Sequence, residues 1–379
     1  AHAQQYDAAF AEWEARKDAD LKDYWPRSEL AYGFMTHHLQ GGVPNHGFTH
    51  WWTMFNPRQL LVHAQLLKAI VNVGSYDWPV REYVLGAFQQ YLRNQNSFCF
   101  WDSGYDKLVP HMSNNNFHPK NNVVENCVFP VLGRGNWISC SEVLVEGREW
   151  AVTPWDAVSL ETLKRHEANL AAQFTGKSEK VYPGDPVGEV GVFQGSSTDL
   201  THVSTASLDL VVTDPPFGGL LHYSELSDFF YVWLRRMLAS IIPDLFGTLL
   251  TPKENELIAA PHRHAGRSEA ANAFFEEGLR NAFSRMASGQ QRHYPLPIFY
   301  AFKQAENDSD AQNNDHIIVA STGWETMLQG LISAGFVICG TWPMRTERTA
   351  RSRSIGSNAL ASSIVLVCRP RPEGAPVTT

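Results

Sequence analysis

The feature that most constrains the fold is a short apolar run, LDLVVT at residues 208–213, followed at once by Asp214, Pro215 and Pro216. Near-continuous apolar runs of this kind are typical of strands in a parallel sheet that is covered on both faces. Proline has no backbone N–H to donate to a strand ladder, so the Pro-Pro pair must end the strand. The run therefore predicts a buried strand at 208–213 in an α/β fold.

The sequence around this run alternates between strand-like and helix-like patterns. Apolar stretches predict further strands at 192–194, 298–302, 336–341 and 363–368, and a helix at 324–333. Such alternation is typical of a sheet with helices on both sides. We therefore expect residues 183–379 to form an α/β unit with a helical insertion at 224–295.

Residues 1–182 have a different residue pattern, and we expect them to form a mostly helical N-terminal region. Apolar residues at helical spacing predict helices that begin at Pro57 and Pro79. Asn56 is a suitable N-cap for the first of these helices, because its side chain can accept a hydrogen bond from a backbone N–H of the first turn. A stretch rich in Gly and Pro at 183–191 predicts the boundary between the two regions.

Composition limits the partners and the cellular compartment that we expect for the protein. Only 18% of the residues are charged and the formal net charge is −8, so a contact with nucleic acid would need a local basic patch. No apolar run approaches the roughly 18 residues of a membrane span. The five cysteines include no Cys-x-x-Cys pair, which argues against a disulfide framework or a zinc ribbon. We therefore predict a cytoplasmic protein with no membrane partner.

The histidines give no metal signature. His262 and His264 lack Cys or carboxylate partners at metal-ligand spacing, and the same holds for the other histidines. We predict no bound metal.

The candidate site is the run Asp214-Pro215-Pro216-Phe217. In open α/β sheets, ligands bind at the carboxyl ends of the strands, which is where this run is expected. The prolines make a stiff support that holds one carboxylate and one aromatic ring at a fixed separation. An ordinary turn with an Asp cap is the alternative, and the Pro-Pro pair disfavours it.

The motif Asp-Pro-Pro-Phe resembles that of amino-methyltransferases that depend on S-adenosylmethionine. Further segments are similar to those of a group of large prokaryotic DNA methylases, described as adenine-specific and carrying a zinc-ribbon module elsewhere in the chain. These segments are GLLHYSELSDFFYVWLRR at 219–236, WPMRTE at 342–347, ALASSIVLVCRPR at 359–371 and FNPRQL at 55–60. The similarity covers about residues 45–371 and is most specific at 208–236.

The resemblance implies a Rossmann-like methyltransferase sheet, S-adenosylmethionine as cofactor and DNA as partner. It implies methylation of an exocyclic amine, adenine N6 rather than cytosine N4, in a restriction–modification or phage-defence system. Such an amine is a poor nucleophile because its lone pair is delocalised into the ring. The Asp214 carboxylate and the Pro215 carbonyl would accept its two hydrogens, and Phe217 would stack on a base rotated out of the helix.

Two further segments are expected to bind cofactor or nucleic acid. Gln194, Gly195 and Ser196 stand where related enzymes hold the adenosine part of the cofactor, and Thr213 and Asp214 would border the same pocket; a plain turn at 194–196 is the alternative. The densest cationic stretch would contact phosphates from a loop near the ligand edge of the sheet, with a solvated loop as the alternative. Its residues are Arg345, Arg348, Arg351 and Arg353.

The helix expected after the motif begins at Ser224, its predicted N-cap. Apolar residues at helical spacing form a stripe that we assign to the core: Leu226, Phe229, Phe230, Trp233, Leu234 and Leu238. Arg235 and Arg236 follow near its C-terminus, where they either compensate the helix dipole or contact phosphate.

One part of such an enzyme is missing from the sequence. Related methyltransferases carry a Phe-x-Gly-x-Gly loop that cradles the methionine part of the cofactor, and no such segment occurs in the 379 residues. We therefore expect an incomplete sheet, and an upstream chain or segment that supplies the loop. Two other functions stay open: an amino-methyltransferase of RNA or of protein glutamine, which more often has Asn at the first motif position, and a non-catalytic part of a defence complex.

Overall fold

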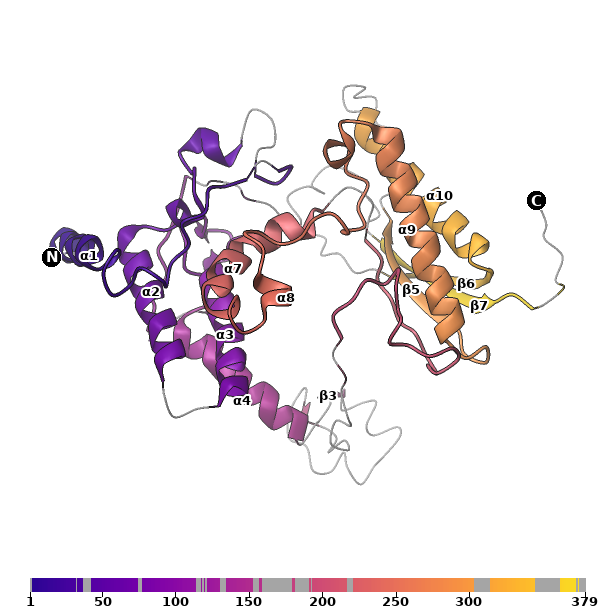
Figure 1. Ribbon diagram of the computed structural model, residues 1–379, viewed down its shortest axis with the longest axis horizontal. Coiled ribbons are helices and arrows are strands. Elements are labelled where there is room, and N and C mark those ends of the chain that lie inside the picture. The colour runs from indigo at the N-terminus through magenta and orange to yellow at the C-terminus, as the bar shows by residue number, and fades with distance from the viewer. Residues whose placement is uncertain are drawn as a thin grey trace. The chain divides into compact units, whose positions relative to one another are not determined.

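The structure is a computed structural model. It describes residues 2–31, 33–36, 42–73, 77–113, 117, 119, 121–129, 134–152, 157–158, 179–180, 191, 193–216, 221–302, 314–344, 362–372 and 374. The chain divides into two compact units (Figure 1). The first unit comprises Ala1–Val192 and Glu225–Thr251, and the second comprises Phe193–Ser224 and Pro252–Thr379.

The first unit is mainly helical. Its elements are α1 (His2–Arg16), η2 (Val43–His46), η3 (Trp51–Met54), α2 (Pro57–Asn72), α3 (Trp78–Arg93), β1 (Phe100–Asp102), β2 (Lys107–Val109), α4 (Trp137–Val152), β3 (Ala157–Val158), β4 (Glu179–Lys180), most of α7 (Tyr223–Leu238) and α8 (Pro243–Phe246). The strands pair as two short antiparallel ribbons, β1 with β2 and β3 with β4.

The start of α2 follows from its sequence. The Asn56 side chain accepts a hydrogen bond from the Gln59 backbone N–H at 2.9 Å, and the Gln59 side chain accepts one from the Asn56 N–H at 3.0 Å. These two bonds satisfy backbone donors that a helix terminus would otherwise leave unpaired. The predicted start at Pro57 is confirmed.

An aromatic core joins α7 to α2 and α3 within this unit. Trp233 is fully buried, and its ring lies 5.3 Å from Phe55 and 6.0 Å from Phe88. Phe229 stacks on Phe55 at 5.7 Å. The stripe predicted on α7 is thus core, as expected. Truncating one such buried aromatic side chain typically costs about 3–5 kcal/mol, so α7 is a principal stabiliser of this unit.

Gly135 has a conformation that other residues adopt at a cost. Its φ is +77°, and an added Cβ would collide with the side chain of Asn94. Its backbone is fixed on both sides, because its N–H donates to Ser139 Oγ at 3.1 Å and its carbonyl accepts from Gln95 Nε2 at 3.0 Å. The chain cannot move away to make room for a side chain.

We expect Gly135→Ala to lower the free energy of unfolding by about 1–3 kcal/mol, through strain and the clash with Asn94. Gly86 is the matched control, because it lies within α3 and an added Cβ there meets nothing within 4 Å. Gly86→Ala should stabilise the protein by up to about 1 kcal/mol. Denaturant titrations of both variants give the comparison, and equal effects would contradict this account.

Two histidines lie deep in the first unit. The His63 Nε2 faces the Gln95 carbonyl at 2.8 Å, and since a carbonyl only accepts, that nitrogen carries the proton. His111 stacks on Phe98 at 4.9 Å, and in the described part of the chain neither of its ring nitrogens has a hydrogen-bond partner. Burial lowers the pKa of His63 to about 4 and that of His111 to about 3, with the Arg93 charge adding to the shift at His111.

The unfolded protein therefore binds more protons than the folded one once the pH falls below the ordinary histidine pKa of 6.5. We expect full stability above that pH, and a loss approaching about 1.4 kcal/mol per pH unit for each histidine as the pH falls toward 4. Unfolding titrations between pH 7 and pH 4.5 measure the slope. His111→Phe, which keeps an aromatic ring, should flatten it, whereas replacing the exposed His46 by Phe should not. An unchanged slope in His111→Phe would contradict the assignment.

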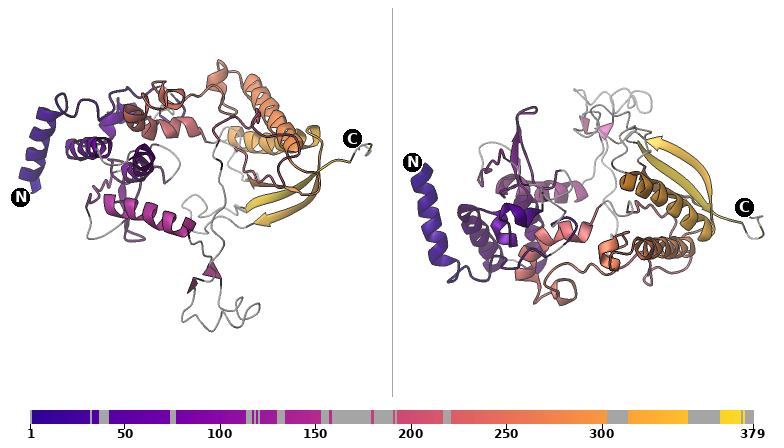
Figure 2. Two further views of the ribbon diagram at one scale, coloured as in Figure 1. Left: turned by 60° about the horizontal axis from the view of Figure 1, so that its bottom comes forward. Right: turned by 90° about the horizontal axis from the view of Figure 1, so that it is seen from above.

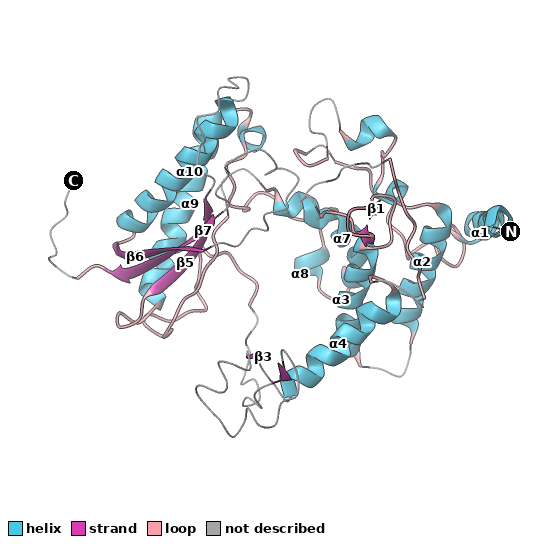
Figure 3. Ribbon diagram, turned by 180° about the vertical axis from the view of Figure 1, so that it is seen from behind, coloured by secondary structure: helices cyan, strands magenta, loops and turns pink. Residues whose placement is uncertain are grey.

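The second unit is built on a three-stranded antiparallel sheet in the order β5-β7-β6. The strands are β5 (Leu296–Phe302), β6 (Phe336–Met344) and β7 (Ser362–Pro370). β7 is antiparallel to both neighbours, so β5 and β6 run in the same direction (Figure 3). The predicted strands 298–302, 336–341 and 363–368 are confirmed, each somewhat longer than expected.

Two long helices lie on one face of this sheet, α9 (Ser268–Gly289) and α10 (Asn314–Ser333) (Figure 2). Phe283 of α9 and Leu331 of α10 share a core with Ile298 of the sheet. The helix predicted at 324–333 is the second half of α10. A short 3-10 helix, η4 (Pro261–His264), precedes α9.

The prediction of a strand at 208–213, buried on both faces, is wrong: these residues form no strand of the sheet and make two isolated parallel bridges, at Leu208 and Thr213. Val211 packs against the core under α9 and α10, but Leu210 is 52% exposed and Val212 is 58% exposed. Successive side chains of an extended chain point to opposite faces, and in the described residues only one of those faces is covered. The apolar pattern predicted burial of both faces, whereas in the described residues this unit buries one face.

Taken together, the described residues form a mixed chain of helices and small antiparallel sheets, and a full Rossmann-like sheet is not among them. The predicted boundary at 183–191 lies outside the described residues except for Gly191. The residues expected as a helical insertion, 224–295, contain α7, α8, η4 and α9, and 225–251 belong to the first unit. No helix in the described ranges is both long and apolar enough to cross a membrane.

Candidate functional site

The candidate motif lies directly after a parallel pairing in the second unit. Leu208 pairs with Gln290 and Thr213 pairs with Ile298, both in the parallel sense. The Thr213 carbonyl accepts a hydrogen bond from the Phe299 N–H at 2.9 Å. Asp214 is therefore the first residue beyond the carboxyl end of this extended segment, as the sequence predicts.

The motif residues differ in their exposure. Pro215 is buried, Pro216 is half-buried, and Asp214 is exposed enough for its carboxylate to reach solvent. Partial burial nevertheless raises the pKa of Asp214, because desolvation disfavours the charged form. Phe217 lies outside the described residues. The structure thus shows a carboxylate that follows the paired segment and precedes a buried proline, and the role of the motif stays a prediction.

The segment that follows the motif is fixed by a carboxylate from a distant loop. The Ser224 N–H donates to Glu256 Oε1 at 2.9 Å, and the Ser224 hydroxyl donates to the other oxygen of the same carboxylate. Arg263 Nη1 donates to Glu256 Oε2 at 2.7 Å and also to the Lys253 carbonyl at 3.1 Å. Because the Arg263 and Glu256 side chains are only 15% and 14% exposed, we call Ser224, Glu256 and Arg263 the buried clamp.

Ser224 is not the helix N-cap that the sequence suggests. α7 begins one residue earlier, at Tyr223, so Ser224 lies inside the first turn. Its backbone N–H is one of the donors that a helix start leaves without an intrahelical acceptor, and Glu256 accepts from it. The capping carboxylate comes from 32 residues further along the chain, which a local pattern cannot reveal.

Tyr223 lies within electrostatic range of the motif. Burial raises the pKa of Tyr223, and the charges of Asp214 and Glu256 raise it further. The ring is 45% exposed. A neutral phenol with an open face thus adjoins both the motif carboxylate and the buried clamp.

His222 and His262 come together although they are 40 positions apart in the sequence. Their rings stack with centroids 5.2 Å apart and an interplanar angle of 16°, and ring nitrogens of the two lie within 4.8 Å of each other. His222 is buried. Sequence spacing missed this pair because the loop that carries His262 folds back beside the residue before α7. The prediction of no bound metal stays a prediction.

The segment predicted to hold the adenosine part of the cofactor is an exposed turn. Ser196 and Thr198 share a hydrogen bond between their hydroxyls at 2.7 Å, and the Asp199 N–H donates to the Ser196 carbonyl at 2.9 Å. Gln194 and Gly195 are exposed and are not in a strand, so the strand predicted at 192–194 is wrong for its described residues. Among the described residues, no hydrogen bond or ion pair joins this turn to the motif.

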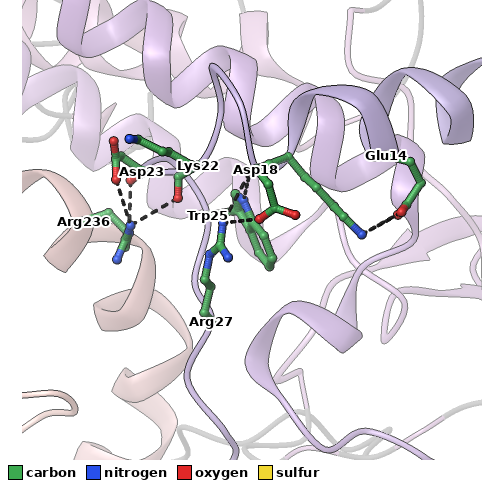
Figure 4. A network of polar contacts seen from close by, with 8 residues as sticks. Glu14, Asp18, Lys22, Asp23, Trp25, Arg27 and Arg236 are labelled. Atoms are coloured by element: carbon green, nitrogen blue, oxygen red, sulfur yellow. Dashed lines mark hydrogen bonds and ion pairs between the residues drawn. The ribbon is translucent and has the colours of Figure 1, made fainter.

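Arg235 and Arg236, at the end of α7, form hydrogen bonds within the first unit. Arg236 donates to the carbonyls of Asp23 and Lys22 at 3.0 and 3.3 Å and pairs with the Asp23 carboxylate at 3.6 Å (Figure 4). Arg235 donates to the Thr248 carbonyl. These bonds favour a structural role over a contact with phosphate.

The arginines expected to contact nucleic acid, Arg345, Arg348, Arg351 and Arg353, lie outside the described residues. The strands that flank them are described, and Met344 pairs with Ser363. β6 runs parallel to β5, and β5 pairs in parallel with Thr213. β6 therefore ends, at Met344, toward the same end of the sheet as the segment 208–213.

No protein-family model and no curated protein matches the chain. One solved structure is similar, a crystal structure from Thermus thermophilus assigned provisionally as a DNA modification methylase, with 12% identity and a TM-score of 0.23. The match covers 49% of this chain and spans about half, 54%, of that chain.

The contribution of the buried clamp to stability can be tested directly by mutation. Arg263→Ala leaves a nearly buried Glu256 carboxylate without its cationic partner, and breaking a buried pair from one side typically costs about 3 kcal/mol or more. Arg280→Ala is the matched control, because its ion pair with Glu277 is about half exposed, at 47% and 59%. Loss of such an exposed pair should cost far less, because solvent screens both charges. Unfolding titrations that gave equal costs would contradict the clamp.

Proposed function

We propose that this chain is the base-presenting part of an S-adenosylmethionine-dependent DNA methyltransferase that modifies an exocyclic amine, adenine N6 rather than cytosine N4. The observation that carries the proposal is the position of Asp214 and Pro215 immediately beyond the parallel pairing of Thr213 with Ile298. A restriction–modification or phage-defence role in the cytoplasm fits this activity and belongs to the same proposal.

In this proposal the motif acts by hydrogen bonding. The Asp214 carboxylate and the Pro215 carbonyl accept the two amino hydrogens, so that the nitrogen becomes pyramidal and its lone pair is directed outward. Desolvation, which raises the pKa of Asp214, makes its carboxylate a stronger acceptor. In this proposal catalysis rests on positioning of the amine and on electrostatic stabilisation, and no covalent intermediate forms.

Phe217 and Tyr223 would bind the base itself. A base rotated out of a duplex needs an apolar or aromatic surface to replace its lost stacking. Stacking on one aromatic ring is worth about 1–3 kcal/mol per base. Phe217 supplies that ring in the proposal, and Tyr223 offers a second half-exposed ring beside Asp214.

The described residues fit one part of the cofactor. S-adenosylmethionine, when bound, supplies an electrophilic methyl group. At Gly195 an added Cβ would meet only His202, at 3.9 Å, so the turn is open, and in this proposal the exposed polar groups of Gln194 and Ser196 bond the ribose hydroxyls. The sequence holds no glycine loop for the methionine part, and we propose that an upstream chain or segment supplies it.

DNA is the substrate class in this proposal, with Arg345, Arg348, Arg351 and Arg353 contacting phosphates. Asp at the first motif position favours DNA over RNA or protein glutamine, for which Asn is commoner. Labelled DNA, RNA and peptide offered in parallel to the native assembly separate these substrates. Methyl transfer to none of the three would leave the non-catalytic alternative.

We expect Asp214→Ala to lower the rate of methyl transfer by the native assembly at least about 100-fold, because an acceptor preorganised for the transition state is lost. The melting temperature should not change, since Asp214 lies beyond the paired segment. Asp209→Asn is the matched control: it alters an exposed carboxylate five residues earlier in the same segment and should leave the rate within a few-fold of wild type. A wild-type rate in Asp214→Ala would refute the acceptor role.

A further inference from the structure

The second unit carries a group of cationic side chains at the end of its sheet where β5 begins and β7 ends. We call it the arginine surface. It consists of Arg292, His293, Tyr294, Arg369 and Arg371. Arg292, His293 and Arg369 are exposed, and Tyr294 is 49% exposed.

Strand register brings the two parts of this surface together. Leu296 pairs with Cys368, so the residues just before β5 lie beside those at the end of β7. Arg369 Nη1 donates to the His293 carbonyl at 2.9 Å, which ties the strand to the turn. The Arg371 N–H donates to the Gly335 carbonyl at 2.8 Å, which holds the chain beyond β7 against the start of β6.

The turn is also held from inside the unit. Gln290 is 1% exposed, and its side-chain Nε2 donates to the Tyr294 carbonyl at 2.8 Å. Three hydrogen bonds thus hold the backbone that carries the surface, and one of them comes from the buried Gln290, so this backbone does not need to order itself when a ligand binds. Preorganisation of this kind lowers the entropic cost of binding.

The local charge is strongly positive on a chain whose formal net charge is −8. The described segments 289–296 and 366–372 contain three arginines and no Asp or Glu, and Glu373 follows outside the described residues. Asp209 is the one acidic residue of the neighbouring segment 208–213. The planar, forked guanidinium group of arginine suits phosphate oxygens better than a lysine ammonium does.

We infer that the arginine surface binds the phosphate backbone of duplex DNA, independently of base sequence. A single-stranded nucleic acid would call for a row of stacking rings, and this surface has one exposed aromatic, Tyr294. An anionic membrane would call for a group of apolar side chains to insert, whereas the strand register places a single half-exposed one, Val337, opposite Arg369. Arginines with few apolar neighbours fit a duplex backbone best.

The position of the surface suits a duplex that reaches the motif. Thr213 pairs with Ile298, so Asp214 lies beside Phe299 along the length of β5. Arg369 lies beside Pro295, just before β5 begins. Four residues along a strand span roughly 13 Å, and the two segments lie on opposite sides of β5, two strand spacings of about 5 Å apart. Phosphates follow each DNA strand about every 3.4 Å, so a duplex at Asp214 also presents phosphates at this distance. The inference goes beyond the proposed function, because backbone binding does not require methyl transfer.

The test is the binding of a labelled duplex to this chain over a range of salt concentrations, for the wild type and for a double variant, Arg369→Gln with Arg371→Gln. Arg280→Gln is the matched control, because it neutralises an arginine on the exposed side of α9. We expect the double variant to bind several-fold more weakly. The slope of log affinity against log salt should become shallower by roughly one unit per arginine. Two duplexes of unrelated sequence should lose affinity equally, and Arg280→Gln should change nothing.

Several outcomes would overturn the inference. These are an unchanged salt slope in the double variant, an equal effect of Arg280→Gln, and binding of anionic vesicles in place of duplex. The Arg369 side chain also ties the turn to β7, so the melting temperature is measured alongside. Arg292→Gln, which leaves that bond intact, should reproduce about half of the slope change, and an unchanged slope in that variant counts against the inference. Salt-dependent binding by this chain, together with no methyl transfer by the native assembly, would reject the proposed function and keep this surface.

Discussion

The parallel pairing of Thr213 with Ile298 is the interaction on which the account of the second unit rests. It fixes where the extended segment ends and in which direction it points. Pro215, which is buried and has no N–H to donate, prevents that segment from continuing. The Asp214 carboxylate is therefore placed by backbone geometry, so its position does not depend on a flexible side-chain network. A group that must hold an amine in one orientation benefits from such rigidity.

The buried clamp extends this rigidity to the chain after the motif. Glu256 caps the first turn of α7 through Ser224, and Arg263 neutralises Glu256. A nearly buried ion pair stabilises little by itself, because desolvation offsets most of the Coulomb attraction. Its value here is that any displacement of Ser224 would remove two hydrogen bonds from a nearly buried carboxylate. Tyr223, which adjoins Ser224, is thereby held in reach of Asp214.

Local patterns predicted the elements whose causes are local. Asn56 and Gln59 cap α2 because both bonds span three residues, and the α7 stripe is core because helical spacing alone sets its face. Long-range features could not be predicted in this way. Glu256 reaches Ser224 across 32 positions, and His222 meets His262 only because a loop folds back. The apolar run at 208–213 indicated that these side chains would be buried, but no local pattern shows which parts of the chain pack against them.

The central claim is that Asp214 and Pro215 hold an exocyclic amine of a DNA base. The most direct measurement is mass spectrometry of the nucleosides in duplex DNA after incubation with the native assembly and S-adenosylmethionine bearing a deuterated methyl group. The account predicts deuterated N6-methyladenine, or N4-methylcytosine if the pocket accepts the smaller base. A deuterated methyl group on a ring carbon, or only on RNA or protein, would contradict it.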